Sequence, residues 1–179
     1  MKTNYWFNQN RLLSHLRTSF CALAIVGTSL TLPSAQADRP EHHGRVSGNF
    51  YPCFHIANVQ QAGRNTIYTF SVTATFTGTF TGSAIITERD VIHPDGSTRL
   101  QGSGVFWSDC GTFLFTYTGT GNAQTGSESA HFVGGQGTGC FRGIHTEGMF
   151  EGNLTAASQG CDITGTGTYN GHIDYEDAD

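Results

Sequence analysis

The chain has 179 residues, with nine basic and fourteen acidic side chains and a formal net charge of −5 at pH 7. All the acidic residues lie from Asp38 onward and the only lysine is Lys2, so the part after residue 37 has six arginines and a formal charge of −8. An acidic surface repels phosphate backbones and anionic lipid head groups, which excludes nucleic acids and bilayer surfaces as expected partners.

Residues 1–37 have the pattern of a secretory signal peptide. The basic residues of this segment precede an apolar run over 20–32, and a small-x-small cleavage pattern ends at Ala37. The apolar run is shorter than the roughly 20 residues that a transmembrane helix needs. We therefore expect a secreted (extracellular or periplasmic) protein that begins at Asp38 and is not inserted in a membrane after cleavage.

The expected mature chain keeps four cysteines, namely Cys53, Cys110, Cys140 and Cys161. Four cysteines in an exported chain predict two disulfides, for which three connectivities are possible. A zinc site is the alternative, but such sites usually contain close Cys-x-x-Cys pairs, which this chain lacks. The spacing therefore favours disulfides.

The remainder is expected to be a flexible leader over 38–45, one domain over 46–176 and an acidic tail over 177–179. Within the domain, short alternating runs interrupted by glycine predict about eight strands. The predicted strands lie near 49–57, 66–76, 84–92, 100–107, 111–118, 125–133, 144–150 and 161–169, the last with a continuation over 172–175. Many short strands with short loops are typical of an all-β sandwich or barrel.

Alternation along these strands places six aromatic side chains on apolar faces, and a barrel of about eight strands either fills its interior or holds one small ligand there. The six are therefore the candidate ligand-binding residues, with a filled barrel as the alternative. They are Tyr68, Phe70, Phe76, Phe113, Phe115 and Tyr117.

Charged residues interrupt one apolar strand at Glu88-Arg89-Asp90. Consecutive strand residues point to opposite faces, so Arg89 must face away from the two carboxylates. Carboxylates inside an apolar cavity would have raised pKa values and could act as acid or base, which makes Glu88 and Asp90 the candidate catalytic residues. The alternative, which we favour at this point, is a solvated position at the barrel rim, three residues before the turn at Pro94.

The sequence predicts no cofactor and no metal site. His172, Asp174 and Glu176 share one strand face, but near an acidic terminus such residues more often form a solvated tail. The glycine-rich run over 134–139 precedes a strand, whereas a phosphate-binding loop precedes a helix.

Four motifs in order resemble the series found in the bacterial DUF3224 family, which is grouped with the allene oxide cyclase-like barrels. They are Phe76-Thr-Gly-Thr-Phe-Thr-Gly82, Pro94-Asp-Gly-Ser97, Gly111-Thr-Phe-Leu-Phe-Thr-Tyr-Thr-Gly119 and Gly135-Gln-Gly-Thr-Gly-Cys-Phe-Arg-Gly143. The resemblance covers about residues 69–152. It implies a closed antiparallel barrel of eight strands with a central cavity.

The DUF3224 family itself implies no established activity, so two functions remain open. The leading one is a non-catalytic secreted barrel that binds a small apolar ligand or acts through its rim loops. The alternative is a cofactor-independent isomerase or cyclase with Glu88 or Asp90 as its carboxylate, because in the plant cyclase a barrel-borne carboxylate promotes epoxide opening.

A closed up-and-down barrel also selects one disulfide connectivity. Alternate connections lie at alternate ends, so Cys110 and Cys140 reach the same rim. Closure makes the first and last strands antiparallel neighbours, which brings Cys53, late in the first, near Cys161, at the start of the last. Because bonded cysteines need Cα atoms within about 7 Å, we expect the pairs Cys53–Cys161 and Cys110–Cys140.

Overall fold

The computed structural model describes residues 43–158 and 160–176; the predicted signal peptide, the leader up to residue 42 and the predicted tail over 177–179 lie outside them. The described chain forms eight strands and one short 3₁₀ helix. In order these are β1 (His43–Ala62), β2 (Asn65–Gly78), β3 (Gly82–Ile92), β4 (Ser97–Ser108), β5 (Gly111–Asn122), β6 (Ser127–Gly135), η1 (Gly139–Phe141), β7 (Ile144–Ser158) and β8 (Cys161–Tyr175).

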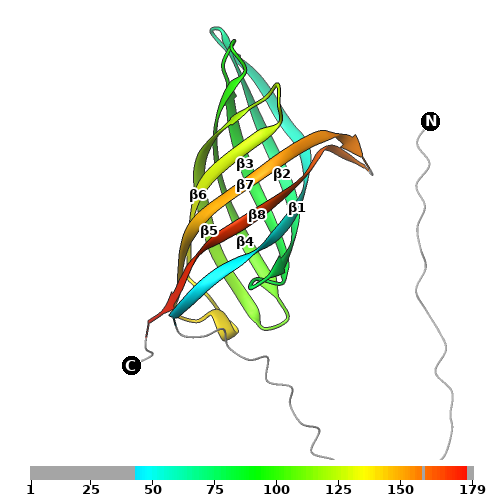
Figure 1. Ribbon diagram of the computed structural model, residues 1–179. Helices are drawn as coiled ribbons and strands as arrows, with labels where there is room; N and C mark the ends of the chain where they lie inside the picture. Colours follow the sequence, from blue (N-terminus) through cyan, green and yellow to red (C-terminus); the bar gives the residue numbers. More distant parts are fainter. Residues whose placement is uncertain (1–42, 159, 177–179) are drawn as a thin grey trace, which may run out of the picture. The chain divides into compact units, whose positions relative to one another are not determined.

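The eight strands form one closed antiparallel barrel in which each strand pairs with its neighbours in sequence and β1 pairs with β8 (Figure 1). The predicted all-β fold class is therefore confirmed, and the sandwich alternative is wrong. Closure leaves no unpaired edge strand, since β1 and β8 satisfy each other's backbone groups. Among the described residues, no helix is long and apolar enough to cross a membrane.

The strands at the chain ends are longer than predicted. β1 begins at His43, inside the expected flexible leader, because His43 pairs with Asp174 of β8 in the sheet. The Nδ1 atom of His43 also lies 2.7 Å from Oδ1 of Asp174. β8 continues without a break through residues 170–171, where the alternating pattern had suggested an interruption.

The barrel has two different ends. One end, here called the aromatic end, carries both outer strand termini, η1, and the β2–β3, β4–β5 and β6–β7 connections. The other end, here called the mouth, carries the β1–β2, β3–β4, β5–β6 and β7–β8 connections. The chemistry of the interior changes from one end to the other.

The aromatic end is filled by side chains. Phe113 is the centre of this core, with ring centroids 4.9 Å from Phe106, 5.2 Å from Phe80 and 5.2 Å from Phe141. Phe80 comes from the β2–β3 connection and Phe141 from η1, so two connections insert rings into this end of the barrel. The filled interior that the sequence left as an alternative applies to this half.

Tyr169 of β8 fixes the β2–β3 connection in its inward position. Its hydroxyl accepts a hydrogen bond from the backbone N–H of Phe80 at 2.8 Å and donates toward the carbonyl of Thr77 at 3.1 Å. Gly48 makes this contact possible, because a Cβ atom at that position would overlap the Tyr169 side chain.

Both disulfide pairs expected from the topology are joined in the structure. Cys53 and Cys161 connect β1 to β8 with a Cα–Cα distance of 5.4 Å, and Cys110 and Cys140 connect two loops at the aromatic end with a Cα–Cα distance of 5.5 Å. Two disulfides in a small domain are typical of an oxidising compartment.

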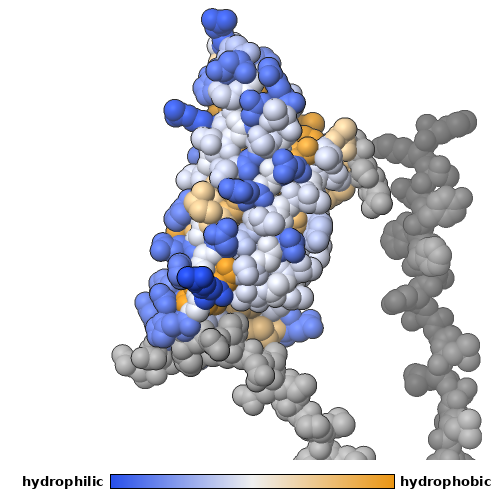
Figure 2. Space-filling view, in the orientation of Figure 1, coloured by the Kyte–Doolittle hydropathy of each residue, from blue (hydrophilic) through white to orange (hydrophobic). Residues whose placement is uncertain are grey.

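The outer wall is largely polar. On the face shown in Figure 2, hydrophilic and near-neutral residues predominate and hydrophobic residues occur in small separate groups. The buried apolar side chains instead form two adjoining clusters inside the barrel, one around Phe106 and Phe113 and the other around Phe54 and Phe70. The wall therefore follows the period-2 alternation expected of strands with one buried face.

Candidate functional site

The carboxylates of Glu88 and Asp90 point into the barrel. Their side chains are 3% and 6% exposed, whereas Arg89 between them is exposed on the outer wall. The favoured rim interpretation is therefore wrong. β3 stays paired on both sides through Ile92, so a residue three positions before the turn still belongs to the wall.

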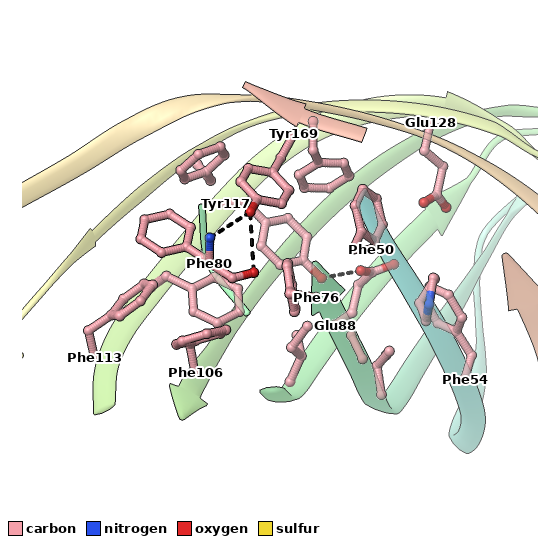
Figure 3. A pocket seen from close by; sticks show the side chains of 17 residues that line it. Phe50, Phe54, Phe76, Phe80, Glu88, Phe106, Phe113, Tyr117, Glu128 and Tyr169 are labelled. Carbon is pink, nitrogen blue, oxygen red and sulfur yellow. Dashed lines mark hydrogen bonds between the residues drawn. The ribbon is translucent and has the colours of Figure 1, made fainter. Parts of the chain in front are cut away.

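Glu88 is bound by a tyrosine from a strand that is not its neighbour. Glu88 pairs with Gly102 of β4, and Gly102 pairs with Tyr117 of β5. Because Gly102 has no side chain, the Tyr117 ring lies across β4, and a Cβ atom at Gly102 would overlap that ring. The Tyr117 hydroxyl donates a hydrogen bond to Oε2 of Glu88 (Figure 3).

Glu128 of β6 is a third interior carboxylate, which the sequence analysis missed. Its side chain lies over Gly121 of β5, and one carboxylate oxygen each from Glu88, Asp90 and Glu128 lie within 4.8 Å of one another. The predicted strand over 125–133 includes Glu128, but its side chain was not assigned to a face. Period-2 alternation predicts an inward side chain for Glu128, because it shares its strand face with Ala130 and Phe132.

The three carboxylates, here called the acidic trio, hold protons more tightly than exposed carboxyl groups do. Burial, and then repulsion by Asp90, raises the pKa of Glu128 to about 8. Burial raises the pKa of Asp90 to about 6. Burial, followed by repulsion from Asp90 and Glu128, raises the pKa of Glu88 well above its usual value.

Two oxygen atoms of the trio are buried without a hydrogen-bond partner: Oε1 of Glu88 and Oδ1 of Asp90. Buried polar atoms in native proteins are nearly always hydrogen-bonded, and leaving one unpaired costs about 1–3 kcal/mol. A proton held between Glu88 and Asp90, or a donor from outside the chain, would satisfy these two oxygens.

The trio lies where two cavities meet. Toward the aromatic end is an inner chamber of about 80 Å³, lined by Glu88, Glu128 and aromatic rings that include Phe50, Phe76, Phe115 and Tyr117 (Figure 3). Toward the mouth is a larger pocket of about 440 Å³, here called the mouth pocket, which Asp90 and Glu128 line. Its apolar wall comes from Phe54, Ile56, Tyr68, Phe70, Leu154 and Ile163, and its polar edge from the β5–β6 connection.

The structure divides the six predicted aromatic residues between these cavities. Phe76, Phe113, Phe115 and Tyr117 line the inner chamber, whereas Tyr68 and Phe70 line the mouth pocket. Further aromatic side chains of the interior were not among the candidates. They are Phe50, Phe54, Phe80, Phe106, Phe132, Phe150 and Tyr169.

The arrangement can hold a cation or exchange protons. Three carboxylates are the ligand type that hard cations prefer. Of the residues first considered for metal binding, Asp174 contacts His43 and Glu176 contacts His145, both exposed pairs far from the trio in the fold. Comparison with protein-family models and with curated proteins gave no match to this chain.

Proposed function

We propose that this chain is exported and that its barrel binds a small, partly apolar molecule in the mouth pocket. The observation that carries this proposal is the contrast between the two halves of the interior. Side chains fill the aromatic end, while the mouth half keeps about 440 Å³ of space between aromatic rings and carboxylates. Eight-stranded barrels have room for one such ligand.

The mouth pocket has the composition of a binding site. Small-molecule sites are concave and mostly apolar, with a few polar groups that fix the ligand's orientation. Phe54, Tyr68 and Phe70 supply a continuous aromatic wall, with ring centroids 5.4 Å apart for Phe54 and Phe70 and 5.7 Å apart for Tyr68 and Phe70. Asp90 and Glu128 supply the polar groups at the floor.

Export and family membership belong to the same proposal. Two disulfides support an oxidising destination, which agrees with the signal-peptide pattern over 1–37. A closed eight-stranded antiparallel barrel supports placing the chain with the DUF3224 and allene oxide cyclase-like proteins, because the motif resemblance implies that architecture.

Native mass spectrometry of the protein purified from its own source tests the proposal. We expect a retained small molecule, or uptake of one equivalent of an environment-sensitive apolar dye with a rise in melting temperature, because a ligand that binds only the folded state stabilises it. Phe54→Trp should reduce dye uptake by filling the pocket, while Tyr51→Trp on the outer wall should leave it unchanged. A melting temperature unaffected by saturating dye would contradict the proposal.

A second candidate, a cofactor-independent isomerase or cyclase, is favoured by one specific observation. Glu88 faces the inner chamber and is hydrogen-bonded to Tyr117, whose pKa is raised by burial and by Glu88. A buried acid next to an apolar chamber can protonate a substrate oxygen. An unsaturated epoxy fatty acid is the probe, and Glu88→Gln should abolish its turnover while leaving its binding intact; equal turnover by both proteins would exclude this role.

A further inference from the structure

We propose that the ligand of the mouth pocket carries an organic ammonium group, which the acidic trio of Glu88, Asp90 and Glu128 binds at the pocket floor. This inference rests on the proposed binding function and names the chemical class of the ligand. It follows from the unpaired carboxylate oxygens of the trio, from the aromatic rings beside them and from the size of the pocket.

The trio has no positively charged partner among residues 43–158 and 160–176. No ion pair involves it in the part of the chain that the structure describes. The arginines of β3 and β4, Arg89 and Arg99, are exposed on the outer wall. Oε1 of Glu88 and Oδ1 of Asp90 are fully buried without a donor. Three clustered carboxylates with two unpaired oxygens therefore require protons or a cation.

An ammonium group fits this requirement better than a metal ion does. It has three N–H donors, one for each carboxylate. Calcium takes six to eight oxygen ligands, whereas the inner chamber on one side of the trio is lined mainly by aromatic and aliphatic side chains. A volume of about 440 Å³ also exceeds what a single ion occupies and leaves space for an organic substituent.

Aromatic rings stand directly beside the carboxylates. Phe70 pairs with Glu88, and Tyr68 pairs with Asp90, in the register of β2 and β3. Side chains directly opposite in an antiparallel pair have Cβ atoms about 4.5–5.5 Å apart. A cation at the trio would therefore lie near ring faces that attract it, and the apolar part of the same molecule would contact Phe54 and Leu154.

Binding should release a proton. At neutral pH Glu128 retains its proton because burial, and then repulsion by Asp90, raises its pKa to about 8. When the ammonium group binds, a carboxylic acid of the trio loses its O–H proton to solvent, and the resulting carboxylate accepts an N–H hydrogen bond. The ammonium group brings one positive charge into the site and the released proton removes one, so the net charge of the site is unchanged.

The pH dependence follows from the groups that face the trio. These are Tyr68 from β2, which pairs with Asp90, and Tyr117 from β5, whose pKa is raised by burial. The charged residues of the other strands around the trio are exposed on the outer wall; they are His55 of β1, His131 of β6, Glu151 of β7 and Asp162 of β8. Affinity should therefore rise about tenfold per pH unit from about pH 6 until Glu128 loses its proton near pH 8.

Calorimetric titration of the exported, purified protein tests the inference. The probes are butylamine, 2-phenylethylamine and octylamine, each compared with the alcohol of the same skeleton. We expect at least one amine to bind about tenfold or more tightly than its alcohol, because hydrogen bonds to charged groups exceed those to neutral ones. Titrations in phosphate and in HEPES, neither of which is a primary ammonium ion, should show about one proton released per amine bound.

Matched variants test whether the carboxylates of the trio bind the amine. Glu128→Gln should lower amine affinity about tenfold, abolish the proton release and leave alcohol binding unchanged. Glu151→Gln, the same substitution on the outer wall, should change neither. Asp90→Asn provides an independent variant of the trio, and circular dichroism establishes that each protein is folded.

The outcomes separate this inference from the proposed function. If the alcohols or an apolar dye bind and no amine binds more tightly, the barrel is a binder but the ammonium inference is wrong. If calcium or manganese chloride binds more tightly than every amine and Glu128→Gln abolishes that binding, the trio is a metal site. If amines, alcohols and dye all fail to bind the folded protein, both proposals are wrong.

Discussion

Tyr117 and Glu88 form the best-defined polar contact of the interior. Substituting Tyr117→Phe removes the donor to Oε2 of Glu88 and leaves a third oxygen of the trio unpaired. We expect the free energy of unfolding to fall by about 1–3 kcal/mol, measured by urea denaturation at neutral pH. The pKa of Glu88 should also rise further, since the hydrogen bond from Tyr117 lowers it.

Tyr51→Phe is the control for this substitution. Tyr51 is 49% exposed on the outer wall, so loss of its hydroxyl should change stability by less than about 0.5 kcal/mol. An equal decrease in the free energy of unfolding for Tyr117→Phe and Tyr51→Phe would mean that the buried hydrogen bond does not stabilise the fold.

The raised pKa values of the trio predict a fold that is less stable at higher pH. Below about pH 3 these carboxyl groups are protonated in both the folded and the unfolded chain. As the pH rises, the unfolded chain loses these protons first, so the folded state binds more protons and stability falls until about pH 6 for Asp90 and about pH 8 for Glu128. We expect a lower melting temperature at pH 8 than at pH 5, by calorimetry without ligand.

Glu128→Gln isolates the contribution of one carboxylate to this trend. The amide does not ionise, so the variant should lose less stability between pH 5 and pH 8, and it should be more stable than the parent by on the order of a few kcal/mol at pH 8. A parent protein whose melting temperature rises over this interval would show that the trio does not keep its protons in the folded state.

At the scale of the strand, period-2 alternation predicted most of the interior. It placed Tyr68, Phe70 and Phe76 of β2 on one face, and the structure has all three inside. It also set Arg89 opposite its two acidic neighbours, but alternation alone gives no sign of which face is the interior. That choice depends on pairing with both neighbouring strands, which is a long-range property of the fold.

The same limit explains the missed parts of the site. Glu128 reaches the trio only because Gly121 on the adjacent strand leaves space, and Tyr117 reaches Glu88 only across Gly102. Both contacts join strands that do not pair with each other, β3 with β6 and β3 with β5, so they depend on the register of every strand between them. Phe80 was missed for another reason, since it lies in a connection and a residue of a turn is usually exposed.

The β2–β3 connection acts as part of the core. Phe80 is 5% exposed, stacks on Tyr169 with centroids 5.8 Å apart, and contacts the Phe113 ring. Phe80→Ala should therefore lower the free energy of unfolding by about 3–5 kcal/mol in urea denaturation, as other truncations of buried phenylalanines do. Met149→Ala, at a 41% exposed position of β7, should lower it by less than about 1 kcal/mol. A small effect of the Phe80 substitution would mean that this connection does not close the aromatic end.

For the whole molecule, the order of strands around the barrel determined both the disulfides and the division of the interior. Aromatic residues gather at the end where two connections insert rings. Toward the mouth, β4 and β5 instead carry glycines, which add no side chain to the interior, namely Gly102, Gly119 and Gly121. The sequence identified the aromatic residues and the glycines but not their separation along the barrel axis. That separation is what leaves one half filled and the other with space for a ligand.

The two disulfides should differ in how much they stabilise the barrel. Cys53–Cys161 joins the first and last strands and spans 108 residues, whereas Cys110–Cys140 spans 30. In the chain-entropy model these loops correspond to about 4.8 and about 3.6 kcal/mol at 25 °C. The Cys53→Ser/Cys161→Ser variant should therefore lose about 1 kcal/mol more stability than the Cys110→Ser/Cys140→Ser variant, in urea denaturation without reductant.

The strand pairing around each disulfide also predicts that loss of Cys53–Cys161 destabilises the barrel more than loss of Cys110–Cys140. Cys53–Cys161 crosses the seam where β1 and β8 close the barrel, and the side chain of Asp162 extends this seam by accepting a hydrogen bond from the backbone N–H of Ile56 at 2.8 Å. Cys110–Cys140 instead joins a tight β4–β5 turn to η1, where Cys140 already donates a backbone hydrogen bond to Cys110 at 3.0 Å. Peptide mapping without reduction must first recover both pairs. If the Cys53→Ser/Cys161→Ser variant then proves at least as stable as the Cys110→Ser/Cys140→Ser variant, hydrogen bonds between β1 and β8 are sufficient to close the barrel without the disulfide.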